Sequence, residues 1–318
     1  MTRRLYLGIE GGATRTAGVL ADGRLRIVAR AVAGPANIYS VGPEEALQAV
    51  EHTVARLLAA AGASKDSIAA SALCMAGVRT SRQAAEWRRL AGNLGLPGQL
   101  LATHDAAAAL AAGSPDCTGV LALCGTGSLA YARRADGAEK FAGGRGPLLG
   151  DEGSGFDIAH RALRAAARSA DRRGPKSLLE SLIPERLGLP DLDALVPWAS
   201  PFAKDRVAGL APIVFEAAAR GDDVAIDIVE DAAEDVAWAV VAAARALWPP
   251  PARPNRVVFA GGVLRNQPGF RISVIAAVVR AIPGVRCALA KSEGALGAAR
   301  LARALYAASD GTRFVFAN

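Results

Sequence analysis

The sequence predicts an α/β protein built from two related halves, and three observations carry this prediction. First, the motif Gly11-Gly12-Ala13-Thr14 recurs as Gly125-Thr126-Gly127-Ser128, 114 positions later (125 − 11). Second, the dipeptide Asp22-Gly23 recurs as Asp136-Gly137 at the same offset (136 − 22). Third, apolar strand patterns alternate with helical patterns, which is typical of a mostly parallel sheet with both faces covered. Together they indicate two copies of one fold.

The first half begins with an apolar strand at residues 5–9, the first Gly-rich turn, a second strand and a third strand near 25–31. From Pro43 to Gly62 the apolar residues recur with the helical period. A strand at 68–75, a helix through Trp87 and Leu94, a strand at 100–102 and an Ala-rich helix at 106–112 follow. The polar break at 113–116 then predicts a domain boundary, with one domain at 1–114 and the other at 115–318.

The second half restarts at residue 118 with its own hairpin. Residues 171–251 are predicted to be nearly all helical, including a long helix over 224–248 that three consecutive prolines end. This helical block is an insertion relative to the first half. A buried strand at 256–260 leads into Gly261-Gly262, and a last helix at 294–305 is expected to pack near the domain junction.

Composition excludes several classes of protein. The chain has 318 residues, of which 52% are hydrophobic and 21% charged, as in soluble globular proteins of about two domains. Its longest uncharged run, 117–132, is broken by glycines and hydroxyl residues, and Glu10 interrupts the first apolar stretch, so we predict neither a membrane span nor a signal peptide and expect a cytoplasmic protein. The net charge of +7 comes from scattered arginines, which predicts no nucleic-acid partner.

The duplicated turns are candidate phosphate sites. A Gly-rich turn followed by a hydroxyl residue exposes backbone N–H groups without an intervening Cβ, as close approach to phosphate oxygens requires. A single turn of this kind is more often a plain β-hairpin, but duplication favours two copies that grip one polyphosphate. Neither copy is a P-loop, because no Gly-Lys-Ser/Thr follows, and neither is a dinucleotide fingerprint, because the turn enters a strand.

Two carboxylates near these turns are candidates for chemistry. Asp105 follows an apolar strand and precedes a helix, so it lies at the carboxyl end of a strand, where open α/β sheets bind ligands. Helix N-capping is an equally good interpretation of Asp105. Glu10 stands between the first strand and the first turn, where a carboxylate is placed to hold a phosphate-bound Mg²⁺.

Two Gly-rich segments in the second half are further candidates. Asp151 and Glu152 lie between Gly150 and Gly153, just before a predicted helix, where acids also complement the helix dipole. The four glycines between 143 and 150 indicate in addition that backbone approaches something closely. Gly261-Gly262 is either an ordinary tight turn or a flank for a flat adenine.

Five motifs resemble, in order and spacing, those of the N-acetylglucosamine kinases among the BadF/BadG/BcrA/BcrD-type ATPases of the actin-like sugar kinase superfamily. They are GIEGGATRT (8–16), THDAAAAL (103–110), CGTGS (124–128), GDEGSGFDIAH (150–160) and FAGGV (259–263). The resemblance covers nearly the whole chain. It implies two ribonuclease H-like domains with a ligand cleft between them that holds ATP and a sugar.

The resemblance also assigns roles to residues. It implies that the turns at 11–14 and 125–128 hold the ATP phosphates, that Glu10 supports Mg²⁺, and that Gly261-Gly262 lies beside the nucleoside. Asp105 matches the catalytic base. Sugar-contacting positions are matched by Asn37, Gly146 and Asp151. Two departures, Arg145 where relatives commonly have Trp and Leu129 where some have Asn, lie near the expected sugar site and leave the amino sugar open.

The expected activity is an ATP- and Mg²⁺-dependent kinase acting on the 6-hydroxyl of N-acetylglucosamine, with small-molecule partners. Glucosamine and N-acetylmuramic acid are alternatives, the latter if Arg145 reaches a lactyl carboxylate. Another class is an ATPase activator of an acyl-CoA dehydratase or reductase, for which Cys117 and Cys124 are the candidate cluster ligands. The retained Glu10, Asp105 and Asp151 argue against a sugar-sensing protein without turnover. Whether the protein is a homodimer stays open.

Overall fold

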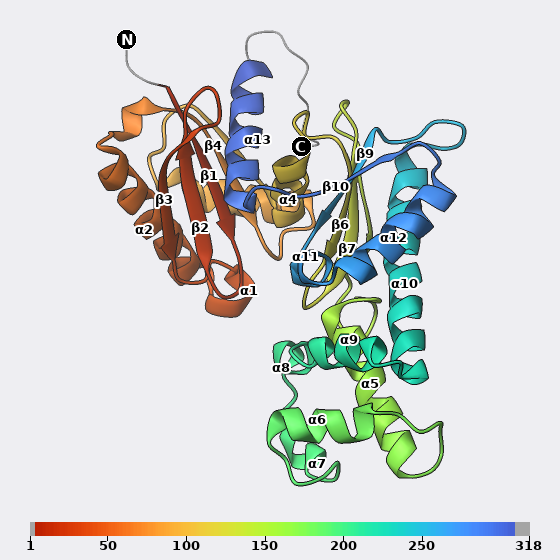
Figure 1. The fold of residues 1–318 in the computed structure, drawn as a ribbon. Coiled ribbons are helices and arrows are strands. Elements are labelled where there is room, and N and C mark those ends of the chain that lie inside the picture. The colour runs from red at the N-terminus through yellow and green to blue at the C-terminus, as the bar shows by residue number, and fades with distance from the viewer. Residues whose placement is uncertain (1–3, 309–318) are drawn as a thin grey trace. The chain divides into compact units, whose positions relative to one another are not determined.

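The computed structural model describes residues 4–308, which form two compact units. The described part of unit 1 consists of residues 4–119, 132–139 and 288–308, and unit 2 consists of residues 120–131 and 140–287. One five-stranded sheet has the order β3-β2-β1-β4-β5 and the other the order β8-β7-β6-β9-β10 (Figure 1). The two orders are equivalent, which confirms the α/β class and the internal repeat.

The sheet of unit 1 is mixed. Strand β1 pairs antiparallel with β2 and parallel with β4, while β2–β3 is antiparallel and β4–β5 parallel. Its strands are β1 (Leu5–Gly11), β2 (Thr16–Ala21), β3 (Ile27–Ala33), β4 (Ile68–Met75) and β5 (Gln99–His104). The helices are α1 (Ile38–Val41), α2 (Pro43–Ala61), α3 (Ser81–Gly92), α4 (Asp105–Gly113) and α13 (Gly294–Ala308), with a 3₁₀ turn at Lys65–Ser67.

Helices cover both faces of this sheet. On one face α2 packs its apolar side onto β2 and β3, and α3, with the fully buried Trp87, packs onto β5. On the other face α13 lies along β1 and β4 and packs against α4. The predicted helix start at Pro43 is confirmed, and Gly62 ends α2 in the left-handed conformation. The carboxyl ends of β1, β4 and β5 therefore meet at one edge of a covered sheet.

Helix α13 belongs to unit 1, which differs from the division at 114/115 that we expected from the sequence. A Cβ atom at Gly8 would lie 2.2 Å from the carbonyl oxygen of Ala295, and one at Gly297 would lie 2.0 Å from that of Ala108. Glycine at both positions lets the backbones of β1, α4 and α13 approach closely. The last helix thus completes the sheet of unit 1 although it follows all of unit 2 in sequence.

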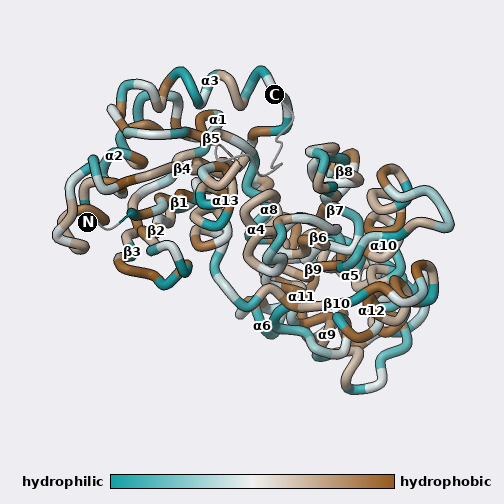
Figure 2. The backbone as a smooth tube through the Cα atoms, turned by 90° about the horizontal axis from the view of Figure 1, so that it is seen from above, coloured by the Kyte–Doolittle hydropathy of each residue, from teal (hydrophilic) through white to brown (hydrophobic). Residues whose placement is uncertain are grey.

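The second sheet carries the helical insertion. Its strands are β6 (Gly119–Cys124), β7 (Ser128–Arg133), β8 (Glu139–Gly143), β9 (Arg256–Ala260) and β10 (Arg286–Leu289). The helices are α5 (Gly155–Ala170), α6 (Leu179–Leu187), α7 (Leu195–Trp198), α8 (Lys204–Ala208), α9 (Ala211–Ala219), α10 (Asp223–Leu247), α11 (Gly262–Asn266) and α12 (Pro268–Ala281). Strands β6 and β9 pair in parallel, and both are mainly hydrophobic segments of the chain (Figure 2). The predicted helical block and its long final helix are confirmed.

Within residues 4–308, every helix is too short or too polar to cross a membrane.

Candidate active site

The first Gly-rich turn (turn 1, residues 11–14) connects β1 to β2. It is closed by the N–H of Gly12, which donates to the carbonyl of Arg15 at 2.9 Å. In the described chain the N–H groups of Ala13 and Thr14 meet no hydrogen-bond acceptor, and both residues are exposed. Two adjacent open N–H groups are what an anionic oxygen requires of a turn.

The second turn (turn 2, residues 125–128) connects β6 to β7 and is closed by a backbone hydrogen bond from its first residue. The N–H of Gly125 donates to the carbonyl of Gly127 at 2.8 Å, and residues 4–308 provide no acceptor for the N–H groups of Thr126 and Gly127. The start of α5 supports this turn from behind, because the N–H groups of Gly155 and Phe156 donate to the carbonyls of Gly125 and Thr126. Each copy of the motif therefore presents two adjacent open donors, at its third and fourth residues in turn 1 and at its second and third residues in turn 2.

Glu10 and Asp105 lie at the carboxyl edge of the sheet of unit 1. Glu10 is the penultimate residue of β1, and Asp105 is the first residue of α4, directly after β5. Burial and the nearby Asp105 carboxylate raise the pKa of Glu10 to about 7, while Arg15 opposes the shift. Burial also raises the pKa of Asp105, against the lowering effects of His104 and of backbone N–H groups at the start of α4. The edge thus holds two interacting, desolvated carboxyl groups.

His104, and not Asp105, is the N-cap of α4. Its Nδ1 accepts a hydrogen bond from the N–H of Ala107 at 3.1 Å, and its Nε2 lies 3.4 Å from Oε2 of Glu139. Asp105 occupies the next position, inside the helix. The capping interpretation of Asp105 is wrong for this reason, and its carboxylate is left for another role. The sequence signal for His104 was weak because His is an uncommon N-cap.

Asn37 lies in unit 1 beside the end of β4. Its Oδ1 accepts from the N–H of Tyr39 and so caps the short helix α1. A Cβ atom at Gly77, which has φ +87°, would lie 3.2 Å from this oxygen. The side-chain amide of Asn37 donates to no residue of the described chain, so one end is fixed and the other is available to a ligand.

Asp151 lies against turn 2 in unit 2. Its Oδ1 accepts from the N–H of Ser128 at 3.3 Å, and its Oδ2 lies 2.5 Å from Nζ of Lys204. The backbone of Asp151 is in the left-handed region at φ +63°, between Gly150 and Gly153. The hydroxyl of Ser128 donates to the carbonyl of Glu152 at 2.6 Å. Sequence reasoning missed Lys204, which is 53 positions from its partner.

Arg145 and Gly146 lie in the loop between β8 and α5. Gly146 has φ +84° and open space around it, and Arg145 is exposed. A Cβ atom at Gly150 would lie 3.0 Å from the backbone nitrogen of Arg145, so the loop folds back on itself. Leu148 and Leu149 are 94% and 76% exposed. In the described part of unit 2 no hydrogen bond or ion pair joins Arg145 or Gly146 to Asp151.

A pocket in unit 2 connects turn 2 with Gly261-Gly262. Gly261 has φ +98°, and a Cβ atom there would lie 2.2 Å from the carbonyl oxygen of Cys124. This close approach seats the start of α11 beside the end of β6. A cavity of about 360 Å³ results, of a size suited to a small ligand. Its lining includes Gly125, Thr126, Gly155, Asp205, Ala208, Pro212, Phe215, Gly262, Asn266 and Gln267.

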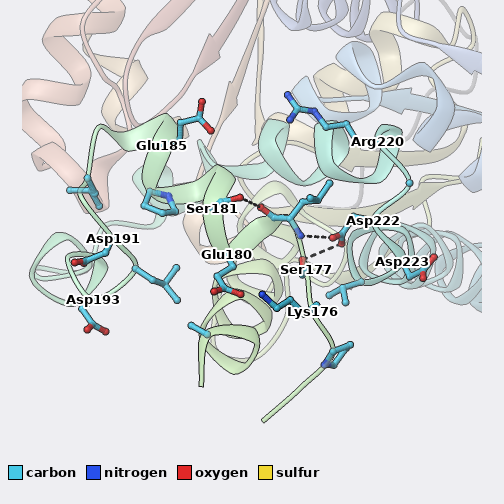
Figure 3. A pocket seen from close by; sticks show the side chains of 18 of the residues that line it. Lys176, Ser177, Glu180, Ser181, Glu185, Asp191, Asp193, Arg220, Asp222 and Asp223 are labelled. Atoms are coloured by element: carbon cyan, nitrogen blue, oxygen red, sulfur yellow. Dashed lines mark hydrogen bonds between the residues drawn. The ribbon is translucent and has the colours of Figure 1, made fainter. Parts of the chain in front are cut away.

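A larger cavity, of about 1260 Å³, lies among the inserted helices (Figure 3). Its buried carboxylate, Asp222, accepts hydrogen bonds from the hydroxyl of Ser177 and from the N–H groups of Leu178 and Ala225. These bonds hold the segment before α6 onto the start of α10. Asp222 is therefore a structural residue, and the turns and carboxylates described above lie elsewhere.

The residues present suit a divalent cation that also binds phosphate. In the described chain no group of three or more His, Cys, Asp or Glu side chains forms a metal cage. Mg²⁺ in phosphoryl-transfer sites is held by one or two carboxylates together with substrate phosphates and waters. Glu10 supplies a carboxylate of that kind at the edge of β1, next to turn 1.

Comparisons with known proteins cover almost the entire chain. The profile of the BadF/BadG/BcrA/BcrD ATPase family matches residues 7–302. An N-acetylmuramic acid/N-acetylglucosamine kinase of Clostridium acetobutylicum is 30% identical over 304 residues, which cover 94% of this chain and 98% of that protein. An N-acetyl-D-glucosamine kinase of Dictyostelium discoideum is 30% identical over 247 residues, covering 73% and 77%.

A solved structure is also similar to this chain over almost its entire length. A crystal structure from Chromobacterium violaceum, of a protein provisionally named an N-acetylglucosamine kinase, has a TM-score of 0.69 and 28% sequence identity. The match covers 95% of this chain and 99% of that one.

Proposed function

Because the chain belongs to the BadF/BadG/BcrA/BcrD ATPase family, we propose that it is an ATP-dependent amino sugar kinase that phosphorylates the 6-hydroxyl of N-acetylglucosamine. The observation that carries the proposal is the carboxyl edge of β1 and β5, where Glu10 and Asp105 stand beside the open donors of turn 1. The names of the Clostridium and Dictyostelium relatives support the sugar.

In the proposed mechanism Asp105 is the general base. Phosphoryl transfer requires a group that accepts the proton of the attacking hydroxyl, and little other covalent chemistry from the protein. Burial raises the pKa of Asp105, which makes its carboxylate a stronger base than an exposed aspartate. Since His104 caps α4, the Asp105 carboxylate is not committed to holding the helix.

The remaining residues position the reactants. The open N–H groups of turn 1 and turn 2 bind phosphate oxygens, and the cavity beside Gly261-Gly262 takes the nucleoside. Glu10 would hold Mg²⁺, which would offset the negative charge of the phosphate groups. Asn37, Asp151, Gly146 and Arg145 contact the sugar in this proposal.

The identity of the amino sugar has alternatives. Glucosamine and N-acetylmuramic acid remain candidate substrates, and the exposed Arg145 is the residue that would meet a lactyl carboxylate.

A different activity, that of an ATPase activator, fits less well. An activator of acyl-CoA dehydratases needs accessible thiolates to bridge an iron–sulfur cluster. Cys117 and Cys124 are buried, and burial raises their pKa values to about 11 and about 12, which keeps both as neutral thiols.

Replacing Asp105 by Asn tests the proposal. The change keeps the size of the side chain and removes the base, so kcat should fall about 10²- to 10⁴-fold while nucleotide and sugar affinities stay near wild type. The melting temperature should stay close to wild type, because His104 is the cap. The assay measures ATP consumption with N-acetylglucosamine, glucosamine, N-acetylmuramic acid, glucose or no sugar. If the Asp105→Asn variant is folded and turns over at the wild-type rate, Asp105 is not part of the mechanism. If the wild-type protein consumes ATP equally fast with and without sugar, the protein is not a sugar kinase.

A further inference from the structure

Lys204 lies directly over turn 2. It is the first residue of α8, and its Nζ lies 2.9 Å from the position that a Cβ atom at Gly127 would take. The next residue, Asp205, lines the cavity beside Gly125 and Thr126. One short segment therefore contributes both to the wall of the nucleoside pocket and to the space beside Gly127.

The ion pair with Asp151 leaves hydrogen-bond donors of the Lys204 ammonium group available. An ammonium group has three N–H donors. Within residues 4–308 its hydrogen-bond partner is Oδ2 of Asp151 alone, which leaves two donors. The side chain of Asp151 is only 5% exposed, whereas that of Lys204 is 29% exposed. The buried carboxylate thus fixes the cation, and the cation reaches solvent above the turn.

Turn 2 otherwise lacks a full positive charge. Its residues carry no basic side chain, and its open N–H groups supply only partial charges to an anion. The triphosphate of ATP carries several negative charges, and lysine binds phosphate as a compact point charge. Because a buried carboxylate already holds the cation in place, the lysine side chain loses little conformational entropy when a phosphate binds.

From this geometry we propose that Lys204 contacts the phosphate groups of bound ATP, with Asp151 holding its ammonium group over turn 2. The inference rests on the ATP binding that the proposed function includes. It assigns to Lys204 a binding role that its pairing with Asp151 alone would not require. If Lys204 were only the counter-ion of Asp151, its loss would affect the stability of unit 2 and would not distinguish ATP from adenosine.

Calorimetry without sugar separates these two roles. Lys204→Gln keeps a donor for Asp151 but removes the charge, and it should weaken ATP binding about 10- to 100-fold while adenosine affinity changes less than about twofold. Lys204→Arg should stay within about fivefold of wild type, because it keeps the charge. Lys176→Gln, which removes an exposed lysine from the larger cavity of unit 2, is the matched control and should leave both affinities unchanged.

A second measurement uses the wild-type protein and so does not depend on how the variants fold. Acetic anhydride acetylates lysine amines, and mass spectrometry measures the extent of acetylation of each lysine. ATP should protect Lys204 and leave Lys176 reactive, and adenosine should protect neither. Unchanged ATP affinity in Lys204→Gln, equal losses for ATP and adenosine, or absence of protection would overturn the inference. ATP binding without phosphorylation of any sugar would reject the kinase and leave the role of Lys204 standing.

Discussion

Turn 1 and turn 2 are both held at two carbonyls, but different side chains lie beside them. In turn 1 the N–H of Gly12 closes the loop, the N–H groups of Ala76 and Ala36 donate to the carbonyls of Gly11 and Gly12, and the adjacent cation, Arg15, is exposed. In turn 2 the start of α5 donates to two carbonyls, and Asp151 accepts from the N–H of Ser128 while it also holds Lys204. Both turns are therefore supported by the surrounding backbone, whereas the frame of turn 2, formed by the starts of α5, α8 and α11, also contains the ion pair of Asp151 with Lys204.

From these differences we infer that the two turns have different tasks. Turn 2 lies beside a formed cavity, so its frame suits a nucleotide that must be held in one position. Turn 1 lies beside Glu10 and Asp105, to which the proposed function assigns the metal ion and the proton transfer. If this division is correct, substitutions at turn 2 should cost more stability and more ATP affinity than equivalent substitutions at turn 1.

The largest effect is expected at the frame of turn 2. Gly261→Ala places a Cβ 2.2 Å from the carbonyl oxygen of Cys124 on a backbone at φ +98°. Strain and overpacking should together lower the free energy of unfolding by about 2–6 kcal/mol. Gly262→Ala is the matched control, because a Cβ there meets nothing within 4 Å. Denaturant unfolding of both variants checks this, and equal stability would show that the frame is not rigid.

The next largest effect is the difference in stability between matching substitutions in the two turns. A Cβ at Gly127 would lie 2.9 Å from both Oδ1 of Asp151 and Nζ of Lys204, so Gly127→Ala should destabilise the protein by about 1–3 kcal/mol. A Cβ at Gly12 would meet only the carbonyl oxygen of Arg15, at 3.2 Å, so Gly12→Ala should change stability by less than about 1 kcal/mol. Thermal unfolding of the two variants, followed by circular dichroism, gives the difference. A reversed order would contradict the proposed difference in support.

The smallest effect is expected at the exposed cation of turn 1. Arg15→Gln should weaken ATP binding only about two- to fivefold, because an exposed charge interacts weakly through solvent. Calorimetry of Arg15→Gln and Lys204→Gln compares the loss of ATP affinity that the removal of each charge causes. A loss at Arg15 as large as that expected at Lys204 would mean that both turns hold the phosphates equally.

Much of the fold followed from local sequence patterns. The duplicated turns, the strand at 68–75, the helix from Pro43 and the long helix before the three prolines all depend on neighbours within a few residues, and the structure has each of them. The positions of Glu10 and Asp105 at strand ends are local in the same sense. The chemistry assigned to these residues stays a prediction until the variants are measured.

Other features depended on contacts between distant residues. The sequence alone indicated that two Gly-rich turns, two carboxylates at strand ends and a late Gly-Gly turn exist, because period, composition and spacing encode them. Only the tertiary structure decided that His104 caps α4, that α13 returns to β1, and that Lys204 meets Asp151 across 53 positions. The reason is physical, since such pairings are selected by close packing and by the pairing of buried polar groups, which a linear pattern does not specify.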